Sequence, residues 1–471
     1  MIEPFAESWK KFGRAVDEIR SETGFGRRLK NIGHLLAGNF GAAAVSMGTV
    51  AIAARALGVE RYGELALIVT FVQAIERFCS FQSWQPVIRY GANLHESGRL
   101  DDLRSLLKFA FFLDVGAALF GFALASTLAY AGAAAFGWSE GALTGVIIYA
   151  SVLLFAVTGV PTGVLRLAGK FREIAYFQVV AMGVRLVLCV AAMLMGGGLI
   201  AFLAIWTATH ILGHLLLIAT GYGMLGKIGA RDFLRRPIGK ISRRFPKIWR
   251  FSVLANLSLS VRSSSQQLDT LLVGAFAGAG GAGVYHIAKR ISKFALQAGQ
   301  QVQAVVFPDV AKLWAKGDIR GFQRVVTQTE TLLVLICGLG ILATLFLADP
   351  VVRLLAGEDF TAAAALLKVQ IFAVAFLLCG SVTRTGLLCM GRESSVFALA
   401  VVATIAFFIS AAVLLPRIGP MGANAAHVIQ GAILFAGLLA MFRAASKREA
   451  AAPRTAPPPN KDLVDRGDFD P

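Results

Sequence analysis

Charged residues are scarce in this chain, and acidic residues are the scarcest. Asp, Glu, Lys and Arg together make up 16% of the 471 residues, below the roughly 25% of an ordinary soluble domain. Hydrophobic residues make up 56%. This composition excludes a soluble globular protein and predicts a protein that is integral to a membrane.

Cysteine is also rare, and its placement excludes a disulfide framework. The five cysteines lie in or beside apolar runs, and none lies in a loop expected on the outer side. They are expected to pack as small hydrophobes. The chain also lacks any pattern resembling a catalytic triad, a metal cluster or a phosphate-binding loop, so neither an enzyme nor a bound cofactor is expected.

What the chain has instead is a series of long apolar runs joined by short loops. Each run is long enough to cross the roughly 30 Å hydrocarbon core of a bilayer as a helix. The runs lie near residues 33–57, 63–88, 106–132, 142–165, 174–195, 199–222, 251–276, 284–308, 325–348, 361–386, 394–415 and 421–442. The sequence therefore predicts an all-α integral membrane protein with about twelve transmembrane helices.

The positions of the basic residues predict the topology. The formal net charge is +18, but the residues are unevenly distributed. If the N-terminus is cytoplasmic, the even-numbered loops and both tails hold 34 of the 46 Lys and Arg residues, and the odd-numbered loops hold only Arg61, Arg353 and Arg417. The positive-inside rule then places both termini in the cytoplasm. Because the charge follows topology and no module of basic and aromatic residues accompanies it, no nucleic acid is expected as a partner.

Glycines at a fixed offset indicate an internal duplication. Gly58 and Gly63 correspond to Gly278 and Gly283 at an offset of 220, and Gly169 corresponds to Gly391 at 222. Six spans in each half give a parallel repeat, which predicts two six-helix lobes around a central cavity. The expected parts are a cytoplasmic amphipathic segment (1–32), an N-terminal lobe (33–222), a basic linker (223–250), a C-terminal lobe (251–443) and a disordered cytoplasmic tail (444–471).

A polar stripe on the eighth span predicts the functional site. The stripe consists of His286, Arg290, Lys293, Gln297 and Gln300, spaced 4, 3, 4 and 3, with Lys289 at its edge. This spacing places them on one face of a helix. An uncompensated Lys or Arg at mid-membrane costs at least about 2.5 to 3.5 kcal/mol. The stripe is therefore expected to face a wet cavity or ionic partners.

Polar residues on other spans complete the candidate site. Gln73 and Arg77 match the stripe on the second span, and Arg262, Gln266 and Asp269 share a face of the seventh. The candidate substrate-binding residues are Gln73, Arg77, Arg262, Gln266, Lys289, Arg290, Lys293 and Gln297. The candidate coupling or charge-pairing carboxylates are Glu76, Asp114 and Asp269. Intramembrane bases outnumber acids, which favours an anionic substrate, and the neighbouring amides suit a sugar phosphate or pyrophosphate.

Two further pairs of polar residues lie within the spans. Asp114 and Arg185 lie deep in the third and fifth spans and are candidate partners for each other. His210 and His214 have the i, i+4 spacing of a metal site. The sequence shows no third ligand, so a packing role and no metal are expected.

Several segments resemble bacterial polysaccharide flippases, the Wzx-type group of the multidrug/oligosaccharidyl-lipid/polysaccharide exporter superfamily. They are residues 54–63 (ARALGVERYG), 269–274 (DTLLVG), 283–285 (GVY), 288–291 (AKRI), 307–308 (FP) and 355–360 (LAGEDF). The resemblance implies alternating access that moves a polyprenyl-pyrophosphate-linked oligosaccharide, an O-antigen or exopolysaccharide repeat unit, from the inner to the outer leaflet of the bacterial cytoplasmic membrane. The implied partners are this lipid-linked substrate, membrane lipids, and the glycosyltransferases and polymerase of the same pathway.

Three alternatives remain open at this stage. A cation-coupled multidrug exporter of the same fold would need acidic groups for cationic drugs, and the excess of bases argues against it. A lipid-linked peptidoglycan precursor flippase would share a cationic cavity but typically has fourteen spans. A membrane glycosyltransferase or polymerase would need acidic catalytic groups or large outer loops.

Overall fold

The computed structural model describes residues 25–136, 140–235, 241–246 and 248–451. Within these residues the secondary structure is helical, and no β-strand occurs. Most of the predicted amphipathic segment (1–32) and of the predicted tail (444–471) lies outside them. The N-terminal half contains α2 (Phe25–Cys79), α3 (Trp84–Glu96), α4 (Leu100–Phe136), α5 (Glu140–Ala150), η1 (Ser151–Phe155), α6 (Gly159–Leu167), α7 (Phe171–Leu194) and α8 (Leu199–Met224).

The C-terminal half follows a short connecting region. That region contains η2 (Phe233–Arg235) and α9 (Ile241–Arg244). The C-terminal half contains α10 (Ile248–Ala315), α11 (Ile319–Ala356), η3 (Glu358–Phe360), α12 (Ala362–Cys389), α13 (Glu393–Ile418) and α14 (Pro420–Ala451). The final helix thus continues beyond Arg443.

Two helices are too long for a single crossing, and each bends at a glycine. A straight helix of the 55 residues of α2 would measure about 83 Å at 1.5 Å per residue. Gly58 interrupts α2 with φ 70° and ψ 177°, and Gly278 interrupts α10 with φ 70° and ψ −175°. Glycine adopts this positive φ without a Cβ clash. Because α2 and α10 each cross twice, the ten apolar helical segments among the described residues make the predicted twelve crossings.

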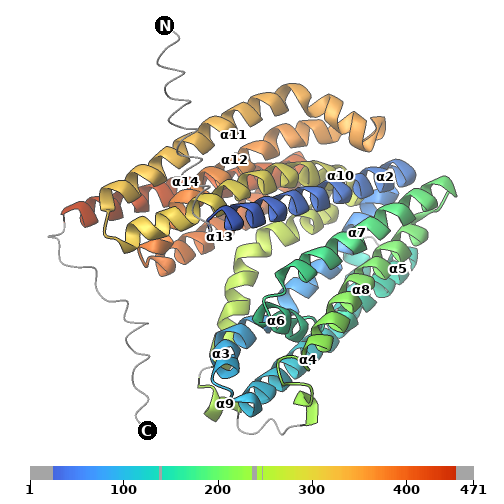
Figure 1. Cartoon of the computed structure of the whole chain (residues 1–471). Coiled ribbons are helices and arrows are strands. Elements are labelled where there is room, and N and C mark those ends of the chain that lie inside the picture. Colours follow the sequence, from blue (N-terminus) through green and yellow to red (C-terminus); the bar gives the residue numbers. More distant parts are fainter. Residues whose placement is uncertain (1–24, 137–139, 236–240, 247, 452–471) are drawn as a thin grey trace.

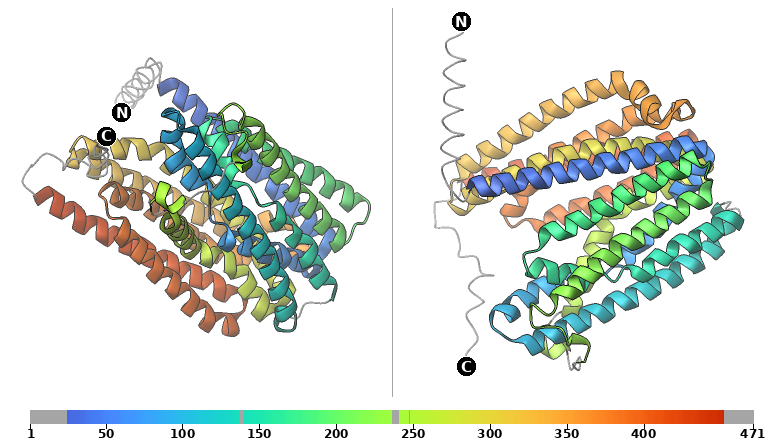
Figure 2. Two further views of the ribbon diagram at one scale, coloured as in Figure 1. Left: turned by 90° about the horizontal axis from the view of Figure 1, so that it is seen from below. Right: turned by 45° about the vertical axis from the view of Figure 1, so that its right-hand side comes forward.

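The helices form two lobes that meet at one end and diverge at the other. Figures 1 and 2 show α3 to α8 in one lobe and α11 to α14 in the other, with α2 and α10 between them and the first part of α10 starting beside α3. The gap between the lobes is widest at the end that carries α3 and the C-terminus of α14, and it closes at the other end. We call these the convergent and divergent ends. The predicted two-lobe, all-α membrane fold is thereby confirmed, and the matching bends at Gly58 and Gly278 agree with an internal repeat.

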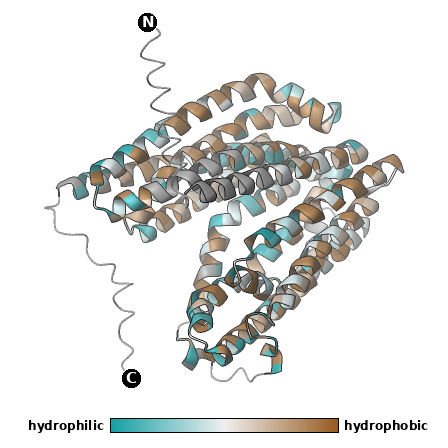
Figure 3. Ribbon diagram, viewed as in Figure 1, coloured by the Kyte–Doolittle hydropathy of each residue, from teal (hydrophilic) through white to brown (hydrophobic). Residues whose placement is uncertain are grey.

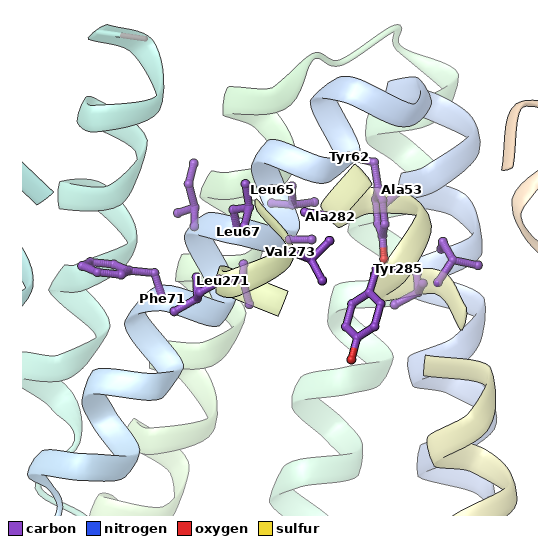
Figure 4. Packing of buried hydrophobic residues seen from close by; sticks show 14 of the residues in the cluster. Ala53, Tyr62, Leu65, Leu67, Phe71, Leu271, Val273, Ala282 and Tyr285 are labelled. Atoms are coloured by element: carbon purple, nitrogen blue, oxygen red, sulfur yellow. The ribbon is translucent and has the colours of Figure 1, made fainter. Parts of the chain in front are cut away.

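The hydrophobic core explains this shape. The largest buried cluster joins both lobes at the convergent end, where Leu65 and Leu67 of α2 pack beside Val273 of α10 (Figure 4). Towards the divergent end each lobe has a core of its own. One surrounds Leu106 in the N-terminal lobe, and the other surrounds Phe322 in the C-terminal lobe. Shared packing at one end and separate packing at the other keep the gap open on one side.

Polar contacts also join the lobes at the convergent end. The Tyr62 hydroxyl lies 2.7 Å from Nδ1 of His286, and the Tyr62 ring packs edge-on against Phe360 with ring centroids 5.7 Å apart. The Arg55 guanidinium donates to the backbone carbonyl of Leu354 at 2.5 Å. This carbonyl lies in the last turn of α11, where helix carbonyls lack intrahelical partners.

The outward-facing surface is apolar, as lipid contact requires. On α11 the side chains of Leu335, Leu339 and Phe346 are 62%, 68% and 74% exposed. Figure 3 shows hydrophobic residues predominating along the helices of both lobes, with hydrophilic residues gathered at helix ends and beside the gap. Contact between this apolar surface and lipid hydrocarbon is favourable, whereas its contact with water would be unfavourable.

Candidate functional site

A polar cavity of about 460 Å³ lies between the lobes. Helices α2, α7 and α8 form its N-terminal wall, and α10, α12 and α14 form its C-terminal wall. Its polar and charged lining residues are Ser46, Thr70, Gln73, Gln178, Arg185, Thr209, His210, His214, Gln266, Gln267, Asp269, His286, Lys289, Arg290, Ser292, Lys293, Gln370 and His427.

The cavity brings together most of the residues selected from the sequence. Gln73, Gln266, Lys289, Arg290 and Lys293 line it, as does His286 of the stripe. Three candidates, Arg77, Arg262 and Gln297, are not among the lining residues, and the Gln300 side chain lies outside the described part of the structure. Of the stripe, only the first two turns, from His286 to Lys293, line the cavity. Beyond Lys293, α10 continues towards the divergent end.

Arg185 belongs to this cavity, and the predicted pairing of Arg185 with Asp114 is wrong. The Arg185 Nε donates to Oγ1 of Thr209 at 2.7 Å, and its guanidinium carbon lies 5.3 Å from the centre of the Trp206 ring. Both contacts fix a cation on the N-terminal wall. Sequence reasoning could not place Arg185 in the cavity, because the position of a single Arg within a span does not show which way its side chain points.

Asp114 has a structural environment instead. Its carboxylate accepts a hydrogen bond of 3.0 Å from the backbone N of Gly159, the first residue of α6. The fourth crossing is broken before this point, between η1 and α6. A broken helix inside a membrane must satisfy the freed backbone groups, and the Asp114 carboxylate does so at the helix start.

Asp269 is the centre of a buried network on the C-terminal wall. The residue is 1% exposed. Its Oδ1 lies 2.6 Å from Nζ of Lys289, and its Oδ2 lies 2.9 Å both from the Tyr285 hydroxyl and from Nε2 of His427. Lys289 also donates to the backbone carbonyl of Gln266 at 2.6 Å. Asp269 thus balances the charge of Lys289, and no ion pair joins Asp269 to Arg262 among the described residues.

The network continues from α14 back to α10. Nδ1 of His427 lies 3.3 Å from Oε1 of Gln430, and Nε2 of Gln430 donates to Oγ of Ser265 at 3.0 Å. Phe407 packs on the His427 ring with centroids 4.5 Å apart. Neither His427 nor Gln430 was selected from the sequence, because a few uncharged polar residues within the apolar twelfth span do not indicate their partners.

The charges that line the cavity do not balance. Asp269 is the one acidic residue among the described lining residues, and it pairs with Lys289. Within the described part of the chain, no carboxylate lies at ion-pair distance from Arg185, Arg290 or Lys293. Three cations from the two lobes therefore face one polar cavity, which suits an anionic ligand.

The histidine pair on α8 has a neighbour that the sequence did not show. Atoms of Glu76, His210 and His214 that can bind a metal all lie within 4.8 Å of one another. The structure thus brings to the pair a possible third ligand that the sequence did not show. Glu76 lies on α2, 134 positions before His210 in the sequence, so only the fold brings them together.

A second, apolar groove of about 760 Å³ lies on the N-terminal lobe. Its walls come from α2, α4 and the beginning of α10, and its aromatic lining residues are Phe78, Phe81, Phe109, Phe112, Phe120 and Trp249. Asn256, at its edge, donates to the backbone carbonyl of Phe78 at 3.2 Å. The groove thus lies where α2 meets the beginning of α10, about one and a half turns along α2 from Gln73 of the polar cavity.

Comparison with known proteins agrees with this architecture. The family model described as "Polysaccharide biosynthesis protein" matches residues 52–365. The chain is 23% identical over 289 residues to "Inner membrane protein YghQ" of Escherichia coli (strain K12), an alignment that covers 60% of this chain and 80% of that protein.

Solved structures show the same fold at low sequence identity. An inward-facing MATE family multidrug resistance transporter of the MOP superfamily gives a TM-score of 0.71 at 14% identity, covering 87% of this chain and 96% of that one. The lipid II flippase MurJ, in an inward closed conformation, gives 0.68 at 15% identity, covering 88% and 90%. An outward-facing MATE transporter gives 0.59 at 15% identity, covering 89% and 96%. The chain belongs to the polysaccharide biosynthesis protein family.

Proposed function

We propose that this protein moves a lipid-linked anionic oligosaccharide, carried on a polyprenyl pyrophosphate, from the inner to the outer leaflet of the bacterial inner membrane. Three cations, Arg185, Arg290 and Lys293, face one cavity with no carboxylate of the described residues at ion-pair distance, and this observation carries the proposal. Membership of the polysaccharide biosynthesis family supports a glycan-bearing substrate. The protein then acts as a transporter that makes and breaks no covalent bond and needs no cofactor.

The cavity chemistry suits a pyrophosphate with sugars attached. Arg185 and Arg290 come from opposite walls and offer planar forks for phosphate oxygens, and Lys293 adds a point charge. Amide side chains beside the cations suit sugar hydroxyls, since each amide both donates and accepts hydrogen bonds. These amides are Gln73, Gln178, Gln266, Gln267 and Gln370.

The apolar groove suits the hydrocarbon tail of the same substrate. Among the described residues, its lining contains aromatic and aliphatic side chains and no charged one. A polyprenyl chain gains about 25 cal/mol per Å² of apolar surface that leaves water. Because Phe78 of the groove and Gln73 of the cavity lie on the same helix, a headgroup in the cavity and a tail in the groove or the adjacent lipid are compatible.

The placement of the opening supports an outward direction of transport. The lobes diverge at the end that carries the basic loops, and the positive-inside rule assigns this end, and both termini, to the cytoplasm. Closing the divergent end and opening the convergent end would expose the site to the outside. Outward movement of two negative charges is favoured by about 4.6 kcal/mol per 100 mV if both cross the whole inside-negative potential.

A double substitution of Arg290→Ala and Lys293→Ala tests the proposal. Cells that carry it are expected to accumulate lipid-linked oligosaccharide on the inner leaflet. The amount of polysaccharide on their surface is expected to fall at least tenfold. Lys368→Ala is the matched control, because Lys368 pairs with Asp349 at 2.6 Å on α11 instead of lining the cavity.

The same strains separate the proposal from the multidrug alternative. A lipid-linked oligosaccharide transporter leaves resistance to cationic dyes and drugs unchanged when it is deleted. The proposal is wrong if the double variant is made at normal levels and surface polysaccharide remains at the level of the Lys368→Ala control. Loss of dye efflux in the deletion strain would favour the multidrug exporter instead.

A further inference from the structure

Three metal-binding side chains meet on the N-terminal wall of the cavity, away from the cations of α10. His210 and His214 lie four residues apart on one face of α8, with ring centroids 4.8 Å apart. Glu76 approaches from α2, and its Oε1 lies 3.8 Å from Nε2 of His214. The nearest ligating atoms of the three side chains all lie within 4.8 Å of one another.

The surroundings orient these side chains as metal ligands are oriented. The Tyr149 hydroxyl, on a fully buried side chain, lies 3.0 Å from Nδ1 of His210. A hydrogen bond at one ring nitrogen fixes the ring and leaves the other nitrogen for a metal, the usual arrangement of metal-bound histidine. Nδ1 of His214 is buried and has no hydrogen-bond partner within the described residues. Buried polar atoms are rarely left without a partner, so this ring nitrogen is available to an ion or a water molecule.

We infer that Glu76, His210 and His214 bind a divalent transition-metal ion such as Zn²⁺. Two imidazole nitrogens and one carboxylate oxygen are a donor set typical of zinc sites that keep a fourth position open. Na⁺, Mg²⁺ and Ca²⁺ prefer shells made of oxygen atoms, so this donor set selects against them. Ligands of a tetrahedral zinc at 2.0 to 2.1 Å lie about 3.3 Å apart, and binding draws the three side chains together from their present separation.

The open coordination position faces the cavity. His210 and His214 line the cavity, whereas Glu76 is not among the lining residues. The ion joins α2 to α8 within one lobe, and a water molecule or an anionic oxygen from the cavity takes the fourth position. This inference concerns the metal alone and holds whatever substrate the cavity binds.

Metal titration of the full-length protein tests the site. The protein is purified in detergent through an affinity tag that lacks histidine, stripped with a chelator and titrated with Zn²⁺. One equivalent is expected to bind. Glu76→Gln and His214→Gln are each expected to lower the affinity at least tenfold, and Tyr149→Phe to lower it about tenfold through the lost orientation of His210. His95→Gln is the matched control, because His95 is exposed on α3.

Thermal unfolding provides a second readout and a test of folding. A ligand that binds only the folded state raises the melting temperature, so Zn²⁺ is expected to raise it for the wild type and His95→Gln, and to leave it unchanged for His214→Gln. A hundredfold excess of Na⁺ or Mg²⁺ is expected to leave Zn²⁺ bound. The inference is overturned if the wild-type protein binds no equivalent of Zn²⁺, or if Glu76→Gln or His214→Gln binds it as tightly as His95→Gln.

Discussion

Gly63 and Gly283 face each other where the two lobes cross at the convergent end, and their contact is reciprocal. A Cβ on Gly63 would lie 1.8 Å from the carbonyl oxygen of Ala279, and a Cβ on Gly283 would lie 2.7 Å from that of Val59. Gly63 meets Ala279 as Gly283 meets Val59, and Val59 and Ala279 are themselves 220 residues apart, as Gly63 and Gly283 are. This is the contact expected at a two-fold axis between repeats, and only glycine permits so close an approach.

Gly63→Ala is expected to force the lobes apart at this crossing. The added methyl group meets backbone atoms, which cannot rotate away as a side chain can, so a destabilisation of about 1 to 3 kcal/mol is expected. The measurement is the melting temperature of the purified protein. Gly183→Ala on α7 is the matched control, because a Cβ there meets nothing within 4 Å. Equal melting temperatures for the two variants would contradict the tight contact.

Tyr62→Phe is expected to favour opening of the convergent end. It removes the 2.7 Å contact between the Tyr62 hydroxyl and Nδ1 of His286, and a typical hydrogen bond contributes about 1 kcal/mol, or roughly a fivefold change in an equilibrium. Spin labels at Arg61 and Arg417, in a variant without native cysteines, report the distance between lobes. A larger population at long distance is expected than for Tyr130→Phe, whose exposed ring lies on α4. Identical distance distributions would show that this contact does not hold the lobes together.

Asp269→Asn and Lys289→Met are each expected to destabilise the protein strongly. Removing one member of a buried ion pair leaves an uncompensated charge, at a cost of about 3 to 5 kcal/mol. The double variant is therefore expected to lose less stability than the two single losses added together. Chemical unfolding of all three variants measures this coupling. Strictly additive losses would show that Lys289 acts independently of Asp269, for instance as a substrate ligand alone.

Arg185→Ala is expected to weaken binding of a pyrophosphate-bearing lipid analogue at least tenfold. The reason is the loss of a cation that Thr209 and Trp206 hold on the N-terminal wall. Arg185→Lys keeps the charge but loses the planar fork, so an intermediate affinity is expected. Titration of the purified variants with a fluorescent analogue provides the measurement. Arg417→Ala, at the exposed end of α13, is expected to bind as the wild type does, and a loss equal to that of Arg185→Ala would point to a non-specific effect of net charge.

The sequence contains enough to predict the fold class and part of the site. Apolar runs identify the crossings because the energy of placing a segment in hydrocarbon depends on its own residues. The glycine repeat locates the bends at Gly58 and Gly278, since positive φ restricts the choice of residue. Helical spacing shows that His286, Lys289, Arg290 and Lys293 share a polar side of α10, since that spacing is a property of one helix.

Only the tertiary structure decided which residues meet. Asp269 and His427 are 158 residues apart in the sequence, and no local pattern links them. The same is true of Glu76 and the histidine pair on α8, and of Arg185 and the cavity. A sequence pattern shows which side of a helix is polar, whereas the rotation and crossing of the helices decide what that side faces. Those are set by packing between distant segments, as at Gly63 and Gly283, where the lack of a side chain on each residue allows the lobes to meet.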